Sequence, residues 1–293
     1  MPFFFLVVGM EIKRELLSGH LSSIKKAATP FAAALGGMVI PALIYLSLVK
    51  GEAARGWAIP MATDIALAVG VLAFMGNRVS FAMKAFLLAL AVIDDIGAIA
   101  IIAIFYTDGV SFPWLFSGLA LFCFIFLFYK FGYSSRLLAT FASLGLWYSF
   151  YRCGIHPTLA GVLIGFALPQ SELLEEKVHS WSSYLIVPLF ALANTGVEIS
   201  KSAISSALTS VVAIGIFLGM VLGKPLGILL FTKIATSLNL AEAPKRSGKF
   251  SLLATGSAAG IGFTVAIFIA ELAFEDPKLQ ELAIIAVIVA SVS

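Results

Sequence analysis

Long apolar runs, separated by short segments that carry most of the charge, are the feature that most constrains how this chain can fold. A helix that crosses the roughly 30 Å hydrocarbon core of a bilayer needs about 20 residues, and runs near that length recur throughout the sequence. Charged residues make up only 12% of the 293 residues, about half of their usual share in soluble domains. The sequence therefore predicts an all-α polytopic membrane protein.

The apolar runs divide into about eleven predicted transmembrane segments, which form one transmembrane domain over residues 1–293. None shows the alternation of apolar and polar residues that marks a membrane β-barrel. The first crosses the bilayer only if all of Pro2–Leu17 is helical, and the last is short, so both ends of the chain look truncated. The segments are Phe3–Met10, Ala28–Val49, Trp57–Met75, Phe81–Tyr106, Pro113–Tyr129, Leu137–Tyr151, Ile155–Leu168, Trp181–Val197, Ala207–Phe231, Phe250–Phe274 and Leu279–Ser293.

The charges between these segments predict the orientation. Of the 19 Lys and Arg residues, 13 fall on one set of alternate loops, 5 on the opposite set and one, Lys224, inside a segment. Cytoplasmic loops carry the excess of Lys and Arg, so we expect the set of 13 to face the cytoplasm. The net charge of +3 gives no reason to expect a nucleic-acid partner.

Four ionisable residues lie inside the apolar segments. Asp94 and Asp95 are adjacent near the centre of one segment, and Asp64 and Lys224 lie within two others. Each such residue costs about 2.5–3.5 kcal/mol on membrane-insertion scales, so the four together cost on the order of 10 kcal/mol. A structural ion pair between Lys224 and one aspartate is an alternative, but it leaves the other carboxyls unexplained. A functional site is therefore favoured.

The chemistry of the two adjacent carboxyls indicates what this site holds. Neighbouring residues on a helix point about 100° apart, so Asp94 and Asp95 can border one cavity. Carboxylate oxygens suit hard cations, and a carboxylate in the membrane is favoured when it holds a proton or a cation. The pair therefore predicts competition between protons and a small alkali cation, which is the minimum requirement for exchange.

Two predicted segments are interrupted near the middle of the membrane. Pro60, Thr63 and Asp64 interrupt one, and the glycine-rich stretch Gly256–Thr264 interrupts the other. Breaks at this depth are tolerated where protein or a water-filled cavity covers the backbone. For the first break, the alternative is a simple proline kink in which Thr63 bonds back to the preceding turn. For the second, glycines that serve close helix packing are equally compatible with the sequence.

The positions of the two breaks match each other. Each interrupted segment is the second of three, within residues 28–106 and 207–293, and the two run in opposite directions by the charge count. This pattern predicts an inverted-topology repeat whose breaks meet at the binding site. If they meet, we expect Asp64 to balance the helix N-termini and Lys224 to balance the C-termini.

Six stretches spread along nearly the whole chain carry a family resemblance. They are Phe3–Leu16, Gly56–Ala66, Ala91–Ile99, Pro188–Asn194, Gly223–Gly227 and Gly260–Thr264. Together they resemble the NhaA-type Na⁺/H⁺ antiporters, an inverted-repeat family. The resemblance implies two crossed, interrupted helices and an electrogenic, pH-regulated exchange of Na⁺, or Li⁺, for H⁺ across a bacterial inner membrane, with no cofactor.

The resemblance also implies roles for individual residues. Asp95 matches the main sodium ligand and proton carrier, assisted by Asp94, with which Lys224 can pair. The residues that match the helix crossing are Thr63, Asp64, Gly260 and Gly262, and those that match alkaline activation are Glu11, Arg14, Glu15 and Glu175. This chain lacks the family's first helix and the β-hairpin that joins protomers, so the homodimer of the family is expected to be weakened here.

Two other functions are compatible with buried carboxyls. A sodium-coupled symporter of an organic anion could share the inverted-repeat architecture. An intramembrane aspartyl protease would also place two aspartates in membrane helices, but it would require Gly-x-Gly-Asp, whereas Val92 and Ile93 precede Asp94 here. We therefore expect a transporter and not an enzyme.

Overall fold

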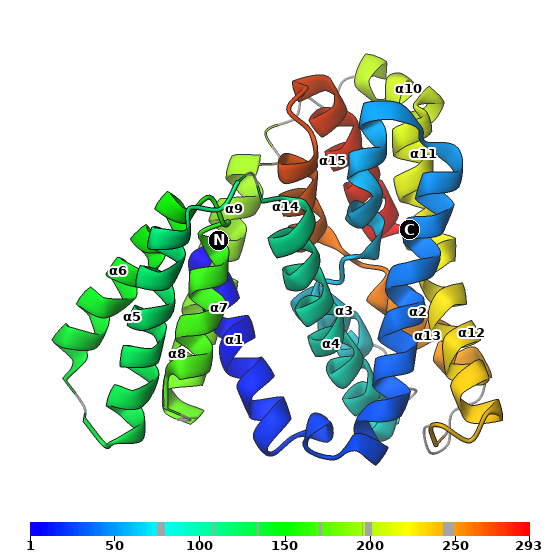
Figure 1. The fold of residues 1–293 in the computed structure, drawn as a ribbon. Coiled ribbons are helices and arrows are strands. Elements are labelled where there is room, and N and C mark those ends of the chain that lie inside the picture. The colour runs from blue at the N-terminus through cyan, green and yellow to red at the C-terminus, as the bar shows by residue number, and fades with distance from the viewer. Residues whose placement is uncertain are drawn as a thin grey trace. The chain divides into compact units, whose positions relative to one another are not determined.

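The protein was described from a computed structural model, in which every regular element is a helix among the residues described (Figure 1). The description covers residues 1–293 except 75–79, 108, 134, 170–171, 195, 197–200 and 243–248. It also leaves out the side chains of residues 20, 24–25, 73, 81, 172–173, 175, 183, 201–204 and 249–250. The predicted all-helical class is confirmed.

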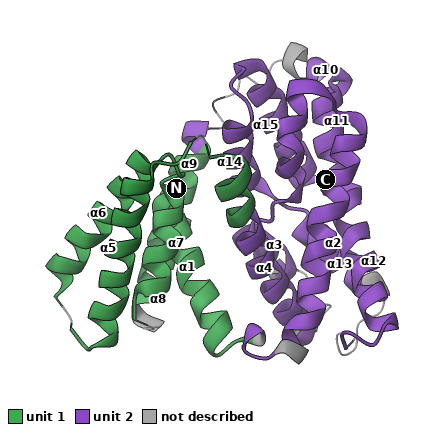
Figure 2. Cartoon of the chain, viewed as in Figure 1, with its two compact units in different colours: residues 1–19, 99–191 green, residues 20–98, 192–293 purple. Residues whose placement is uncertain are grey.

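The chain forms two compact units (Figure 2). Unit 1 comprises residues 1–19 and 99–191, and unit 2 comprises residues 20–98 and 192–293. Two of the three boundaries fall inside helices, α4 (Phe81–Phe105) and α9 (Val187–Asn194), and the third lies after α1. Each unit is therefore built from two separate stretches of sequence.

Unit 1 begins with α1, which spans the whole of Pro2–Leu17, as the first predicted segment requires. Its core consists of apolar side chains from α5, α6 and α7, with Ile125, Leu146 and Ile164 among them. Ser135 caps the start of α6, and Gly154, at φ +92°, ends it in the left-handed conformation that favours glycine. The other elements of unit 1 are α5 (Phe112–Lys130), α6 (Arg136–Cys153), α7 (Thr158–Ala167), α8 (Glu172–Trp181) and η4 (Ser182–Ile186).

Unit 2 holds all four ionisable residues that the sequence places inside apolar segments. Its core gathers alanines and large aliphatic side chains from α2, α3, α4, α12 and α13. Its elements are η1 (His20–Ser22), α2 (Ile24–Leu48), η2 (Gly51–Met61), α3 (Ile65–Phe74), most of α4, α10 (Lys201–Thr209), α11 (Val211–Leu218), η5 (Gly219–Gly223), α12 (Lys224–Ser237), α13 (Lys249–Ala259), α14 (Phe263–Ala273) and α15 (Pro277–Val292).

Close backbone contact joins α2 to α12. A Cβ built on Gly36 would lie 2.2 Å from the carbonyl oxygen of Gly227, and one on Gly227 would lie 2.1 Å from that of Gly36. In lipid, helices gain little from burying apolar surface against each other, so packing through small residues is a main source of their association. The two glycines thus allow α12 to lie directly against α2.

Several of the predicted segments form helices that are long enough to cross a bilayer. Within the described residues, four helical stretches are long and apolar enough to span a bilayer, and two bent helix pairs raise this to six. The other predicted segments also coincide with helices, but α1, α7 and α15 have only 16, 10 and 16 residues. These fall short of the roughly 20 that a crossing needs. The four stretches are Lys26–Leu48, Ala82–Phe105, Phe112–Lys130 and Val211–Ser237.

Both predicted interruptions are present. The helix axis bends by 45° between η2 and α3, and by 46° between α13 and α14. The first interrupted segment differs from its predicted bounds, because its first arm already starts at Gly51 and is a 3₁₀ helix. A 3₁₀ helix rises about 2.0 Å per residue, against 1.5 Å in an α-helix. The arm therefore reaches the break with fewer residues than an α-helix of equal length.

A wide turn, η5, directly precedes Lys224. The Lys224 N–H donates to the carbonyl of Gly219, five residues back, which is the π-helical pattern. Pro225 follows, and a proline has no N–H and collides with the carbonyl four residues before it in an α-helix. The same order occurs in unit 1, where η4 is followed by Val187 and Pro188. We attribute each wide turn to the proline after it.

Candidate functional site

The breaks of the two interrupted helices are in direct contact. The Asp64 N–H donates to the Ile261 carbonyl over 2.7 Å. A Cβ built on Gly262 would lie 2.5 Å from the Ala62 carbonyl oxygen, so the backbones touch where a side chain would not fit. The expected meeting of the breaks is thus found in unit 2, and it is formed by residues 62–64 and 260–262.

Asp64 joins the N-termini of two helices at this contact. Its Oδ1 accepts from the Leu67 N–H, 3.2 Å away, in the first turn of α3. Its Oδ2 accepts from the N–H and the hydroxyl of Thr264, at 3.2 and 2.6 Å, in the first turn of α14. A carboxylate is stabilised at a helix N-terminus by the partial positive charge of the unpaired N–H groups. Asp64 is buried and serves two such ends at once.

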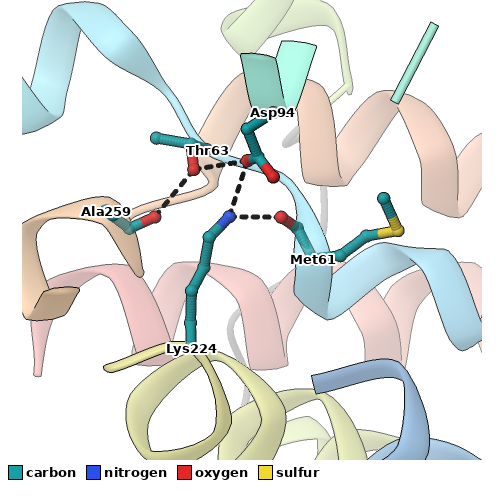
Figure 3. Close-up of polar contacts among 5 residues, drawn as sticks. All are labelled: Met61, Thr63, Asp94, Lys224 and Ala259. Atoms are coloured by element: carbon teal, nitrogen blue, oxygen red, sulfur yellow. Dashed lines mark hydrogen bonds and ion pairs between the residues drawn. The ribbon is translucent and has the colours of Figure 1, made fainter. Parts of the chain in front are cut away.

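Lys224 extends from α12 to the opposite kind of helix end (Figure 3). Its ammonium donates to the Met61 carbonyl, which belongs to the C-terminal turn of η2. It also forms an ion pair with Asp94, with Nζ and Oδ2 2.8 Å apart. The exposed fractions of the two side chains are 0% and 1%. A buried pair of this kind is stable only because each charge has the other and further hydrogen bonds.

Thr63 connects Asp94 to the second interrupted helix (Figure 3). Its Oγ1 lies 2.6 Å from Asp94 Oδ2 and 3.0 Å from the carbonyl oxygen of Ala259, the last residue of α13. A hydroxyl carries one hydrogen, so it cannot donate fully to both acceptors. The alternative of a simple kink, in which Thr63 bonds back to its own preceding turn, is wrong, because its partners lie 31 and 196 residues away.

Asp94 and Asp95 lie together in the buried part of α4. Lys224 pairs with Asp94, and Asp94 Oδ1 is a buried oxygen that accepts no hydrogen bond from the residues described. That oxygen is a candidate ligand atom. The ion pair leaves the burial of Asp64 and Asp95 to be explained by something other than Lys224, so a purely structural salt bridge does not account for the site.

The residues expected to respond to pH are not part of this cluster. Glu11, Arg14 and Glu15 lie on α1 in unit 1, where Glu15 is buried. Glu175 lies on α8, and its side chain is outside the described part of the chain.

Sequence reasoning missed three groups in the site. Two are the backbone carbonyls of Met61 and Ala259, which carry no sequence signature because every residue has one. The third is the Thr264 hydroxyl, for which a signal did exist. A hydroxyl residue just after the Gly260–Gly262 break, at the start of a helix, is placed to bond a carboxylate from another segment.

The chain is similar along its whole length to known transporters. The family model described as "Na+/H+ antiporter 1" matches residues 1–293. The Na(+)/H(+) antiporter NhaA of Shewanella frigidimarina is 46% identical over 285 residues, which cover 94% of this chain and 72% of that protein. The protein of the same name from Escherichia coli O1:K1 is 44% identical over 305 residues, covering 100% and 78% of the two chains. That of Citrobacter koseri is 45% identical, covering 99% and 78%.

Proposed function

Because the chain belongs to the Na⁺/H⁺ antiporter 1 family, we propose that it exports Na⁺, or Li⁺, in electrogenic exchange for H⁺ across a bacterial inner membrane. It is a transporter and not an enzyme. The observation that best supports the proposal is the pair of buried aspartates on α4, one of them bound to a buried lysine. Ionisable residues inside membrane helices are costly and rare, and they typically mark ion or proton pathways.

Competition at the aspartates would couple the two ions. Asp95 is the main ligand and proton carrier in this proposal, and Asp94 assists it. A carboxylate neutralised by either H⁺ or Na⁺ cannot hold both, so binding of one sodium ion from the cytoplasmic side displaces more than one proton from the two aspartates, as electrogenic exchange requires. Protons arriving from the other side displace sodium in turn. Sodium bound at Asp94 Oδ1 would also compete with the Lys224 ammonium on Oδ2 for the negative charge of the same carboxylate.

The oxygen ligands around the aspartates suit sodium. No three acidic, histidine or cysteine side chains gather around one point in the described part of the chain. A cation bound at the α4 aspartates would therefore need neutral oxygens as well, and the Thr63 hydroxyl is within 2.6 Å of Asp94. A site with few formal charges and several neutral oxygens is compatible with a weakly held, exchangeable monovalent ion.

The helix ends support the placement of this site. Asp64 accepts hydrogen bonds at the N-termini of α3 and α14, and Lys224 donates to the C-terminal turn of η2. We propose that these two residues balance the charges of the crossed helix ends. We also propose that residues 28–106 and 207–293 are inverted repeats within one transporter domain of about eleven crossings, with the crossing at Gly260 and Gly262 as their meeting point.

Regulation and assembly are proposed from the family alone. Glu11, Arg14, Glu15 and Glu175 are the candidates for pH response. A homodimer is the candidate assembly.

Sodium-driven proton flux tests the proposed function. Everted membrane vesicles are first acidified inside, and sodium is then added outside with no organic substrate present. Sodium-induced proton efflux is expected over a series of pH values. Absent proton efflux, together with sodium uptake that requires an added organic anion, would instead identify a sodium-coupled symporter. Peptide cleavage by the purified protein would identify an intramembrane protease.

A further inference from the structure

The wide turn η5, at Gly219–Gly223, touches each part of the helix crossing. A Cβ built on Gly219 would lie 2.7 Å from Cβ and 3.1 Å from Cγ of Pro60, at the end of η2. The Met220 carbonyl oxygen and side chain lie against Gly260 and Gly262, at 2.8 and 3.2 Å from a Cβ built on each. The turn is therefore packed against both interrupted helices.

Four links, three contacts and one peptide bond, form a closed loop that passes through Lys224. The Lys224 N–H donates to the Gly219 carbonyl, and the Lys224 ammonium donates to the Met61 carbonyl. Met61 is bonded to Pro60, and the Pro60 ring lies on Gly219. Because this loop is closed, a shift of Gly219 on Pro60 also shifts the point from which the Lys224 side chain reaches Met61 and Asp94.

The width of the turn sets the direction of the lysine. A π-turn contains one residue more than an α-turn, and one residue corresponds to about 100° of rotation and 1.5 Å of rise along a helix. If residues 219–224 formed a regular α-helix, the Lys224 side chain would point in another direction relative to α11. The absence of a side chain on Gly219 allows the wide turn to rest on Pro60.

We propose that Gly219 is a positioning residue of the exchange site, which holds the Lys224 ammonium in register with Met61 and Asp94 by resting on Pro60. The inference rests on the proposed function, because it gives Lys224 and Asp94 a part in sodium exchange. It adds a residue that touches neither the aspartates nor the transported ion.

Gly219→Ala and Gly215→Ala form a matched pair for the test. Gly215 lies four residues earlier in the same helical run and is also buried, but its added methyl would meet the Tyr45 ring at 3.0 Å and Val49 at 3.2 Å, away from the crossing. Both variants gain the same methyl group and the same helix propensity. Only Gly219→Ala pushes against Pro60.

The measurements are the apparent KM for sodium and the maximal rate of sodium-induced proton flux, at matched amounts of inserted protein. We expect Gly219→Ala to raise the KM roughly tenfold, since displacements near 1 Å in a reacting site have effects of this order or larger. Gly215→Ala is expected to change the KM less than about twofold. Replacing the obstructing ring in the double variant Gly219→Ala/Pro60→Gly should bring the KM back toward that of Pro60→Gly alone.

Equal KM shifts in Gly219→Ala and Gly215→Ala, or no recovery in the double variant, would overturn the inference while wild-type exchange stands. Absent exchange in the wild type would overturn the proposed function instead. If Gly219→Ala does not insert, Pro60→Gly carries the test, because it removes the ring that Gly219 contacts and adds no side-chain atoms. Its KM is expected to rise, and an unchanged KM contradicts the inference.

Discussion

The Lys224 ammonium and the Asp94 carboxylate form an ion pair of 2.8 Å between two segments that are 130 residues apart in the sequence. Neither side chain reaches water by more than 1% of its surface. The lysine also holds the Met61 carbonyl, so a single side chain connects α12, α4 and the end of η2. This arrangement makes the charge on each partner dependent on the other.

Removing the lysine should therefore destabilise the fold more than it alters ion preference. Lys224→Ala leaves the Asp94 charge buried without its partner, which is expected to cost about 3–5 kcal/mol. Thermal unfolding in detergent measures the effect. Lys233→Ala, at an exposed position of the same helix, is the control and should leave the Tm nearly unchanged. Equal melting temperatures for the two variants would contradict this prediction.

Neutralising the main proposed carrier should abolish transport without loss of the protein. Asp95→Asn keeps the size of the side chain but cannot alternate between a proton and a sodium ion. We expect normal insertion and no sodium-dependent proton flux in everted vesicles. Glu275→Gln, which removes a carboxyl from an exposed position, should keep full exchange. Exchange that survives in Asp95→Asn would show that another group carries the proton.

The hydroxyl of Thr63 is expected to matter more than its volume. Thr63→Val keeps the shape but removes the donor that lies between Asp94 and the Ala259 carbonyl. The acceptor that holds this single hydrogen then loses its donor, at a cost of about 1–3 kcal/mol. Thr63→Ser keeps the hydroxyl and should retain both Tm and sodium affinity more fully. If Thr63→Val and Thr63→Ser change Tm and sodium affinity equally, Thr63 contributes through packing and not through hydrogen bonding.

Asp64 should be intolerant even of its amide analogue. Asn offers one acceptor oxygen where the carboxylate uses both oxygens on the N–H groups of two helices. One helix end then faces an NH₂ group, and the expected loss is about 1–2 kcal/mol. Asp276→Asn is the comparison, because Asp276 caps only α15 with one oxygen and Asn caps as well as Asp. A Tm that falls no further in Asp64→Asn than in Asp276→Asn would contradict the double role.

Several features of this protein follow from local sequence alone. The length and apolarity of each run predict helices, because lipid offers no partner for unpaired backbone groups. The cost of ionisable groups in lipid singles out Asp64, Asp94, Asp95 and Lys224 without any knowledge of the fold. Pro60 and the glycines near residue 260 mark the breaks for equally local reasons, and the structure contains both breaks.

Other features depend on partners that are distant in the sequence. Thr63 bonds to Ala259, 196 residues away, and Asp64 bonds to Thr264, 200 residues away. The residues next to each of them in the sequence do not predict these partners. The sequence does not predict that the carbonyls of Met61 and Ala259 take part in the site, since every residue carries a carbonyl. The approach of the wide turn to Pro60 through Gly219 likewise joins residues 159 positions apart.

The sequence by itself thus determined that this chain is helical, lies in a membrane, contains four ionisable groups within apolar segments and has two interrupted helices, because the cost of each feature in lipid is local. Only the tertiary structure decided which groups meet. It paired Lys224 with Asp94 and Met61, and Asp64 with two helix ends, because hydrogen bonds act over about 3 Å and depend on how segments far apart in the chain are packed.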